Sequence, residues 1–327
     1  MSKPAIVIVT PALAAANNGN WQTAQRWARM LQSDYAVRLT ERWAGGNEAL
    51  MIALHARRSA DSVAAWRLAH PVRPLALVLT GTDLYRDIAT DVAAQTSLQL
   101  ADRLVVLNQL GLRQLPAALR AKGLVCLQSS SARSRRIKTS RHLRALMVGH
   151  LRDEKSPQTF FDAARLLADR NDILFDHIGA DLDPALGAEA RALDIDNPRY
   201  RWLGALPHGA TRARIQAAHV LVHASRMEGG AHVVIEAVVS GTPVIASRIA
   251  GNIGLLGADY AGYFEWGDAG ALASLLQRAC DDAAMLPALQ AQCNARVPLF
   301  SPAHERQTLH ELLVDLLPNP TLVKDAP

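Results

Sequence analysis

The chain has 327 residues, of which 50% are hydrophobic and 20% charged, and at roughly 100 to 200 residues per domain this length predicts two domains with sizeable cores. The three cysteines form no CxxC pair, so neither a disulfide framework nor a cysteine zinc site is indicated, and a cytoplasmic location is expected. With 35 basic and 30 acidic residues, the net charge of +5 is compatible with an anionic partner without identifying it.

The N-terminus allows two interpretations. Lys3 and the apolar run after it imitate a short secretory signal. Pro11 interrupts that run, however, and the residues of Ile6–Val9 are all β-branched, so a buried first strand is preferred. No run reaches the roughly 18 apolar residues that a membrane helix needs, and no stable membrane insertion is expected.

Short apolar runs alternate with helical patterns along the first half, which is typical of a parallel sheet covered by helices. Strands are predicted at Ile6–Thr10, Ala36–Leu39, Met51–Leu54, Leu75–Thr80 and Leu104–Leu107. Helices are predicted at Trp21–Leu31, Ser62–Ala69, Asp87–Leu100 and Leu110–Ala121. A basic segment without acidic residues, Arg133–Arg144, then separates two pattern blocks and is interpreted as a linker.

The second half repeats the alternation. Strands are predicted at Leu143–Val148, Ile173–His177, Arg201–Leu203, Val220–His223 and Pro243–Ala246. Helices are predicted at Pro157–Ala168, Ala210–Ala217, Val233–Val239, Ala271–Ala279 and Met285–Asn294, followed by a last helix at Glu305–Leu317 that folds back onto the first domain. The expected fold is therefore α/β, with two Rossmann-like doubly wound domains. Their expected bounds are residues 1–132, with 302–327 packing back on them, and residues 133–301, with ligands in the cleft between.

The turn after the first predicted strand is the first candidate for ligand binding. Asn17-Asn18-Gly19-Asn20 precedes a helix, so backbone N–H groups and amide side chains there are available to a sugar or phosphate. The turn lacks the G-x-G-x-x-G spacing of dinucleotide binders, which argues against a Rossmann dehydrogenase.

The strongest stretch runs from Ser225 to Glu236 and is followed by Gly-Thr-Pro-Val. Gly229 and Gly230 lie between a strand and a helix, where the free N–H groups of the first helical turn favour a phosphate. Glu236 is placed to accept two hydrogen bonds from a vicinal diol such as a ribose, and Glu228 to reach a sugar hydroxyl.

These residues resemble the GT-B glycosyltransferases of the glycosyltransferase-4 type, whose mark is E-x7-E in such a loop and helix, here Glu228 and Glu236. The resemblance covers nearly the whole chain and implies a metal-independent, UDP-sugar-dependent enzyme. It implies that Glu236 holds the ribose, and that Glu228 and the loop hold the sugar and diphosphate through Gly229, Gly230, Ala231, His232, Val233 and Val234.

A second family element, a glycine loop with a basic pair, is matched by Val148–Lys155. The resemblance implies that Lys155 stabilises the leaving UDP. His150 replaces the family's arginine, and because residues 150 and 152 point the same way in an extended segment, we expect Arg152 to supply the missing guanidinium. Two motifs that imitate the DxD of metal-dependent transferases, Asp181–Asp183 and Asp194–Asp196, are interpreted as polar loop and helix-flank residues.

The expected acceptor side is basic. His55 and Arg57 end or follow one strand, and Asp83 and Arg86 follow the next. An acceptor that is already an anion needs positive charge rather than a strong general base; the alternative is that these arginines are ordinary surface residues.

A narrower resemblance rests on four segments: NNGNWQTAQRW, TGTDLYRD, VGHLRDEK and SRMEGGAHVVIEA. Together they are similar to the selenosugar synthases of selenoneine biosynthesis, which join N-acetylglucosamine from UDP-GlcNAc to the selenium of selenophosphate. The resemblance implies small-molecule substrates, with the selenophosphate-producing and downstream selenoneine enzymes as partners. The phosphoryl group would be placed by Asn18, Gly19, Asn20, Thr23 and Arg26, with Gly19 also counted on the donor side.

Two other functions stay open. One is an ordinary GT-B enzyme that transfers a sugar to a hydroxyl acceptor. The other is a non-enzymatic binder that uses the basic linker, but no aromatic residue lies among those arginines to stack on bases, and no nucleic-acid partner is expected.

Overall fold

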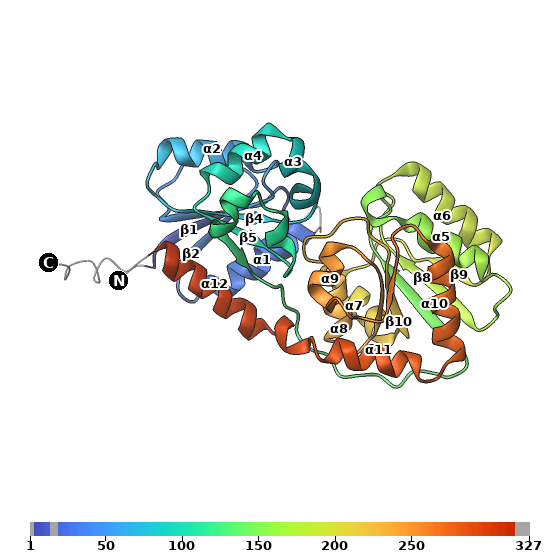
Figure 1. Ribbon diagram of the computed structural model, residues 1–327. Helices are drawn as coiled ribbons and strands as arrows, with labels where there is room; N and C mark the ends of the chain where they lie inside the picture. The colour runs from blue at the N-terminus through green and yellow to red at the C-terminus, as the bar shows by residue number, and fades with distance from the viewer. Residues whose placement is uncertain (1–2, 14–18, 318–327) are drawn as a thin grey trace. The chain divides into compact units, whose positions relative to one another are not determined.

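The computed structural model describes residues 3–13 and 19–317, and the chain divides into two compact units. The first unit is Met1–Ser129 with Pro302–Pro327, and the second is Ser130–Ser301. Each contains one parallel six-stranded sheet flanked by helices (Figure 1). The predicted class, two parallel α/β sheets, is confirmed. Among the residues described, no helix combines the length and apolar character needed to cross a bilayer.

The sheet of the first unit has the order β2-β1-β3-β4-β5-β6. Because the chain runs from β1 to β2 on one side and to β3 on the other, the order reverses between β1 and β3, and the loops after these two strands flank the reversal. The strands are β1 (Ala5–Val9), β2 (Ala36–Thr40), β3 (Leu50–Leu54), β4 (Leu75–Leu79), β5 (Arg103–Val106) and β6 (Gly123–Val125).

The two faces of this sheet carry separate cores because side chains alternate along each strand. Ile6 and Ile8 pack with Trp27 of α1 (Gly19–Leu31) and with Leu309 of α12 (Pro302–Leu316). Val7 and Val9 of β1 pack on the opposite face with α2 (Ala60–Ala69) and α4 (Val92–Leu100). The C-terminal helix therefore returns to the first unit as predicted, and it begins three residues earlier, with a proline in its first turn.

The sheet of the second unit has the order β12-β11-β10-β7-β8-β9, with its reversal between β7 and β10. The strands are β7 (Leu143–Val148), β8 (Ile173–Ile178), β9 (Tyr200–Trp202), β10 (Val220–His223), β11 (Val244–Ser247) and β12 (Tyr263–Phe264). The helices are α5 (Pro157–Leu166), α6 (Pro184–Asp196), α7 (His208–Ala217), α8 (His232–Val238), α9 (Ala250–Leu256), α10 (Ala269–Asp281) and α11 (Met285–Asn294).

Two predicted helices of the first unit are wrong as continuous elements. In place of Asp87–Leu100 there is a π-helical turn at Asp83–Asp87, a short helix α3 (Ile88–Thr90), and a break at Asp91. Asp91 is extended and its carboxylate accepts a hydrogen bond from the Ala94 N–H, so it caps α4 instead of continuing the helix. In place of Leu110–Ala121 there are two 3-10 turns, interrupted where Pro116 keeps the preceding residue extended.

Sequence reasoning missed β6, α6, α9 and β12. Helix α6 had a readable signal, because Asp183 accepts hydrogen bonds from two amides of its first turn and Pro184 occupies the first helical position. Asp183 and Asp196 therefore lie at the two ends of α6, in line with their interpretation as polar loop and helix-flank residues, but the helix between them was not predicted. The other three elements are short and carry no comparable signal.

Candidate functional site

The two sequence motifs of the second unit meet at one edge of its sheet. Strands β7 and β10 are parallel neighbours, with Val220 opposite Ala145, so the loops at their carboxyl ends start side by side. Lys155 Nζ contacts Glu228 Oε1, although 73 residues separate them. The Arg226 N–H also donates to the Glu154 carbonyl at 2.9 Å. The two motifs therefore form a single site.

Glu228 is a largely buried carboxylate with two basic neighbours. Its side chain is 12% exposed, and His223 Nε2 lies 3.4 Å from the oxygen that contacts Lys155. Burial alone would raise the pKa of Glu228, but the charge of Lys155 and the nearby His223 imidazole outweigh it and hold the pKa well below its usual range. Glu228 is therefore ionised at neutral pH.

The loop that carries Lys155 is closely packed against the neighbouring strand. A Cβ atom added at Gly179 would lie 1.9 Å from the Gly149 carbonyl oxygen, so only glycine fits there. His150 Nδ1 accepts a hydrogen bond from the Ala180 N–H at 3.0 Å, and burial, followed by the charges of Arg152 and Lys155, lowers its pKa. A neutral His150 therefore does not replace the charge of an arginine at this position.

The backbone of Arg152 is extended, with φ −158° and ψ 154°, in agreement with the extended segment predicted around residues 150 and 152. Its Nε atom lies 4.0 Å from a Glu154 carboxylate oxygen. Its assignment as the substitute guanidinium stays a prediction.

Glu236 lies on α8 in a pocket of basic side chains. Its carboxylate is 2% exposed, and the same oxygen is 2.5 Å from His208 Nε2, 3.3 Å from His232 Nδ1 and 3.8 Å from Arg212 Nε. Burial would raise its pKa, but the hydrogen bonds from the two histidines lower it to about 2. Glu236 is thus an ionised acceptor, as a ribose-binding carboxylate must be.

The segment that opens α8 is fixed by close packing. Of the amides predicted to face an anion, the Val234 N–H donates to the Ala231 carbonyl at 2.9 Å and is used within the turn. A Cβ atom added at Gly251 would lie 2.0 Å from the Glu228 carbonyl oxygen, so this glycine lets α9 approach the loop.

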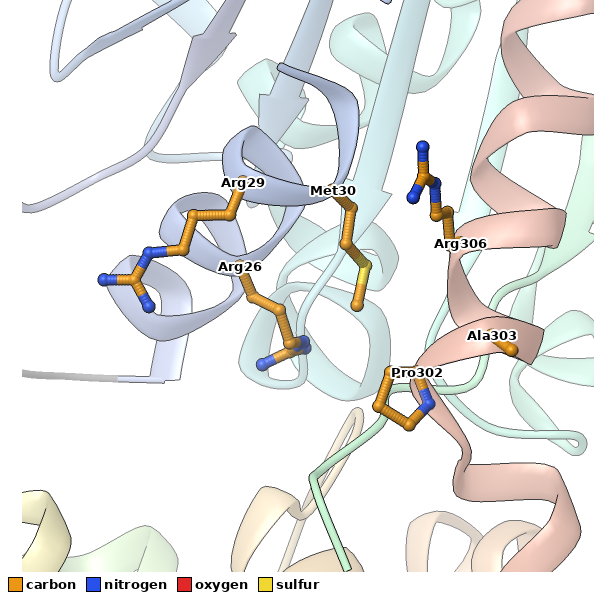
Figure 2. A pocket seen from close by; sticks show the side chains of 6 residues that line it. All are labelled: Arg26, Arg29, Met30, Pro302, Ala303 and Arg306. Atoms are coloured by element: carbon orange, nitrogen blue, oxygen red, sulfur yellow. The ribbon is translucent and has the colours of Figure 1, made fainter. Parts of the chain in front are cut away.

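The predicted acceptor residues of the first helix lie partly outside the described residues. Asn18 is among those not described, whereas Gly19 and Asn20 begin α1. Thr23 Oγ1 donates to the Gly19 carbonyl at 2.8 Å. Arg26 Nε donates to both carboxylate oxygens of Glu305 at 2.9 and 3.1 Å, and Arg26 lines a hollow between α1 and α12 (Figure 2). Arg26 thus helps to hold the last helix, and its role toward an acceptor stays a prediction.

His55 and Asp83 follow the neighbouring strands β3 and β4. His55 has a left-handed φ of 73° and its Nε2 lies 3.1 Å from Thr82 Oγ1. Burial lowers the pKa of His55, partly opposed by Asp83, whose carboxylate oxygen is 3.9 Å from Nδ1. Non-glycine residues with positive φ concentrate at functional sites, which singles out His55 in this group.

The carboxylate of Asp83 accepts hydrogen bonds from the backbone N–H groups of Ala56, Thr80 and Gly81. These bonds tie the ends of the two strands together. Two basic side chains of this group pair with Asp87. Arg86 Nε lies 2.9 Å and Arg57 Nε 3.5 Å from its carboxylate oxygens.

Sequence reasoning missed His208, Arg212, His223 and Gly251. His223 is the last residue of β10, where ligand-binding residues are common, so its position was a usable signal. The other three lie away from both motifs in the sequence and carry no local signal.

The family model of glycosyl transferases group 1 matches residues 131–296, which is 166 of the 327 residues. No curated protein sequence is significantly similar to the chain.

Three solved structures resemble the chain. A sucrose-phosphate synthase of Thermosynechococcus elongatus is 17% identical, with a TM-score of 0.77 over 96% of this chain and 99% of that one. HepE of Anabaena, in complex with UDP and glucose, is 15% identical, with a TM-score of 0.72 over 95% and 100%. A TarM variant of S. aureus, in complex with fondaparinux, α-GlcNAc-glycerol and UDP, is 12% identical, with a TM-score of 0.65 over 80% and 55%.

The chain therefore spans about half the length of TarM and nearly all of the other two proteins. At these identities the structural likeness concerns the fold. Because the family model covers half of the chain and includes the site at β7 and β10, the protein is a glycosyltransferase of the GT-B fold and belongs to the group 1 glycosyltransferases.

Proposed function

We propose that the protein transfers N-acetylglucosamine from UDP-GlcNAc to the selenium of selenophosphate and releases UDP, in the cytoplasm and without a metal ion. The donor half of the proposal rests mainly on the contact between Lys155 and Glu228, which joins the two donor motifs into one charged site. The selenium acceptor rests on the resemblance carried by the segments NNGNWQTAQRW, TGTDLYRD, VGHLRDEK and SRMEGGAHVVIEA. HepE and TarM have been solved with UDP, and the TarM complex also holds a GlcNAc compound.

In this proposal the donor lies across the carboxyl ends of β7 and β10. The ionised Glu236 accepts hydrogen bonds from the two hydroxyl groups of the ribose, and the Lys155 side chain turns from Glu228 to the diphosphate. Glu228 is then released to accept a hydrogen bond from a hydroxyl group of the sugar. The amides at the start of α8, apart from that of Val234, face the phosphates. Charge that develops on the leaving diphosphate meets a fixed cation, which lowers the barrier without a metal.

The acceptor step needs a nucleophile rather than a strong base. The bond from the anomeric carbon to the UDP oxygen breaks and its electron pair leaves with UDP, while an electron pair on selenium forms the new C–Se bond. The phosphoryl group stays on selenium in this step. Selenophosphate is already an anion, so the basic side chains of Arg57 and Arg86 are suited to attract it. Its supply requires a partner enzyme that makes selenophosphate.

One observation favours the alternative, transfer to a hydroxyl group. Neutral His55 lies beside Asp83 and Thr82, which is an arrangement that a general base uses. A hydroxyl acceptor needs such a base, whereas selenophosphate does not. Replacing His55 by Gln therefore distinguishes the two: it should abolish transfer to an alcohol and leave most of the transfer to selenium.

The direct test is mass spectrometry of the purified protein incubated with UDP-GlcNAc and fresh selenophosphate, in the presence of a chelator. We expect a sugar product with the isotope pattern of selenium, together with UDP. A parallel sample contains a mixture of alcohols instead. UDP release only with alcohols would favour the alternative, and no UDP from either sample would contradict the donor assignment.

A further inference from the structure

Three potential metal ligands converge in the second unit. The ligand atoms of His208, His232 and Glu236 all lie within 4.8 Å of one another. His232 and Glu236 are four residues apart on α8, a spacing that places two side chains on one helical face. His208 is the first residue of α7 and arrives from a different part of the chain. The proposed binding of the donor ribose by Glu236 gives no role to the side chains of His208 and His232.

The donor atoms suit a zinc-type ion. Two imidazole nitrogens and one carboxylate oxygen are a donor set found in zinc sites that keep a fourth position open. The nitrogens of His208 and His232 lie 2.5 and 3.3 Å from the same Glu236 oxygen, so an ion enters once the first of these contacts widens. The side chain of His208 is 49% exposed and has room to turn, whereas Glu236 is buried and fixed.

The surrounding charge limits where an ion can lie. Arg212 Nε is 3.8 Å from the same Glu236 oxygen and repels a second cation on its side. Its guanidinium is anchored by the Ser131 carbonyl at 2.8 Å and by Ser240 Oγ at 3.4 Å. The ion therefore takes the side of the carboxylate that faces the two histidines, and the arginine weakens its binding.

We propose that His208, His232 and Glu236 bind a divalent transition-metal ion of the zinc type, and that the ion and the donor nucleotide exclude each other. The ion and the nucleotide exclude each other because both bind the Glu236 carboxylate. This exclusion rests on the proposed function, whereas the metal site itself does not. A bound ion would thus act as an inhibitor of a transferase that needs no metal.

The metal site is tested by titrating the chelator-treated full chain with Co²⁺ and recording its visible absorption, which is intense for a four-coordinate ion. We expect the signal in the wild type and its loss in His208→Asn and in His232→Asn, with thermal unfolding confirming that both variants are folded. The matched control is Cys280→Ser, in the second cluster of potential ligands, Asp172, Cys280 and Asp281. A signal that survives both histidine substitutions, or that disappears in the control, overturns the proposal.

The exclusion is tested by calorimetry of UDP binding with and without Zn²⁺, in the wild type and in His208→Asn. Because the diphosphate itself chelates zinc, both proteins are compared at the same total metal. We expect zinc to weaken UDP binding about tenfold more in the wild type than in the variant. Equal weakening contradicts the exclusion. If neither protein binds UDP without zinc, the proposed function fails, and the Co²⁺ titration still decides the metal site.

Discussion

Replacing Lys155 by Met removes the cation that contacts Glu228. The two side chains are 17% and 12% exposed, so the pair lies between the buried and the exposed limits. Breaking a buried pair costs about 3 to 5 kcal/mol and an exposed pair about 0 to 1 kcal/mol, which places this pair near 2 kcal/mol. The second unit spans residues 130–301. At roughly 2 to 4 °C per kcal/mol for a domain of this size, its midpoint should fall by about 4 to 8 °C.

The pH dependence of this loss has a definite sign. In the wild type, Lys155 holds the pKa of Glu228 low, so the pair stabilises the fold above the usual carboxyl pKa and this contribution disappears as the pH falls through the lowered value. In K155M burial is less opposed and the pKa of Glu228 rises, so the variant loses stability as the pH rises above about 4 to 5.

Scanning calorimetry of K155M, E228Q and the double variant at pH 4.5 and 7.5 measures these effects. The double variant should recover most of the loss, because no unpaired carboxylate remains buried. A double variant that is no more stable than K155M, or a loss that is equal at both pH values, would refute the argument.

Three further predictions concern single contacts. E236Q removes a charged acceptor worth roughly 1.5 to 3 kcal/mol and should weaken UDP binding about tenfold to a hundredfold by calorimetry, and unchanged affinity would show that the ribose lies elsewhere. In G251A the added Cβ would lie 2.0 Å from the Glu228 carbonyl oxygen and forces the Glu228 loop away from α9, so UDP binding should weaken. The control D61A, at an exposed position of α2, should leave UDP binding unchanged, and equal affinities of the two variants would mean that the loop moves without cost. D83A leaves three backbone N–H groups without their acceptor and should lower the stability of the first unit by about 3 kcal/mol in urea unfolding, so a loss below about 1 kcal/mol would show that water replaces the carboxylate.

Most of the strands, although not β6 and β12, could be predicted from the sequence, and so could the positions of the two motifs, because both depend on local pattern. Val220–His223 and Leu143–Val148 are strands with the predicted bounds, since a short apolar run in a parallel sheet is buried on both faces. The spacing of Glu228 and Glu236 was readable for a similar reason. Loop, glycines and helix follow one another within a single segment, so their order is fixed by the chain itself.

The meeting of distant side chains could not be predicted, because it depends on how strands and helices pair in the folded chain. Lys155 reaches Glu228 because β7 pairs with β10, and a strand's pattern does not say which strand becomes its neighbour. His208 and Arg212 reach Glu236 because α7 packs against α8, from 24 or more residues away in the sequence. Local chemistry divided a predicted helix at Asp91, because its extended backbone interrupts the helix and its carboxylate caps the start of α4. Strand order and helix packing are set by the sum of many weak contacts, and no single motif encodes that sum.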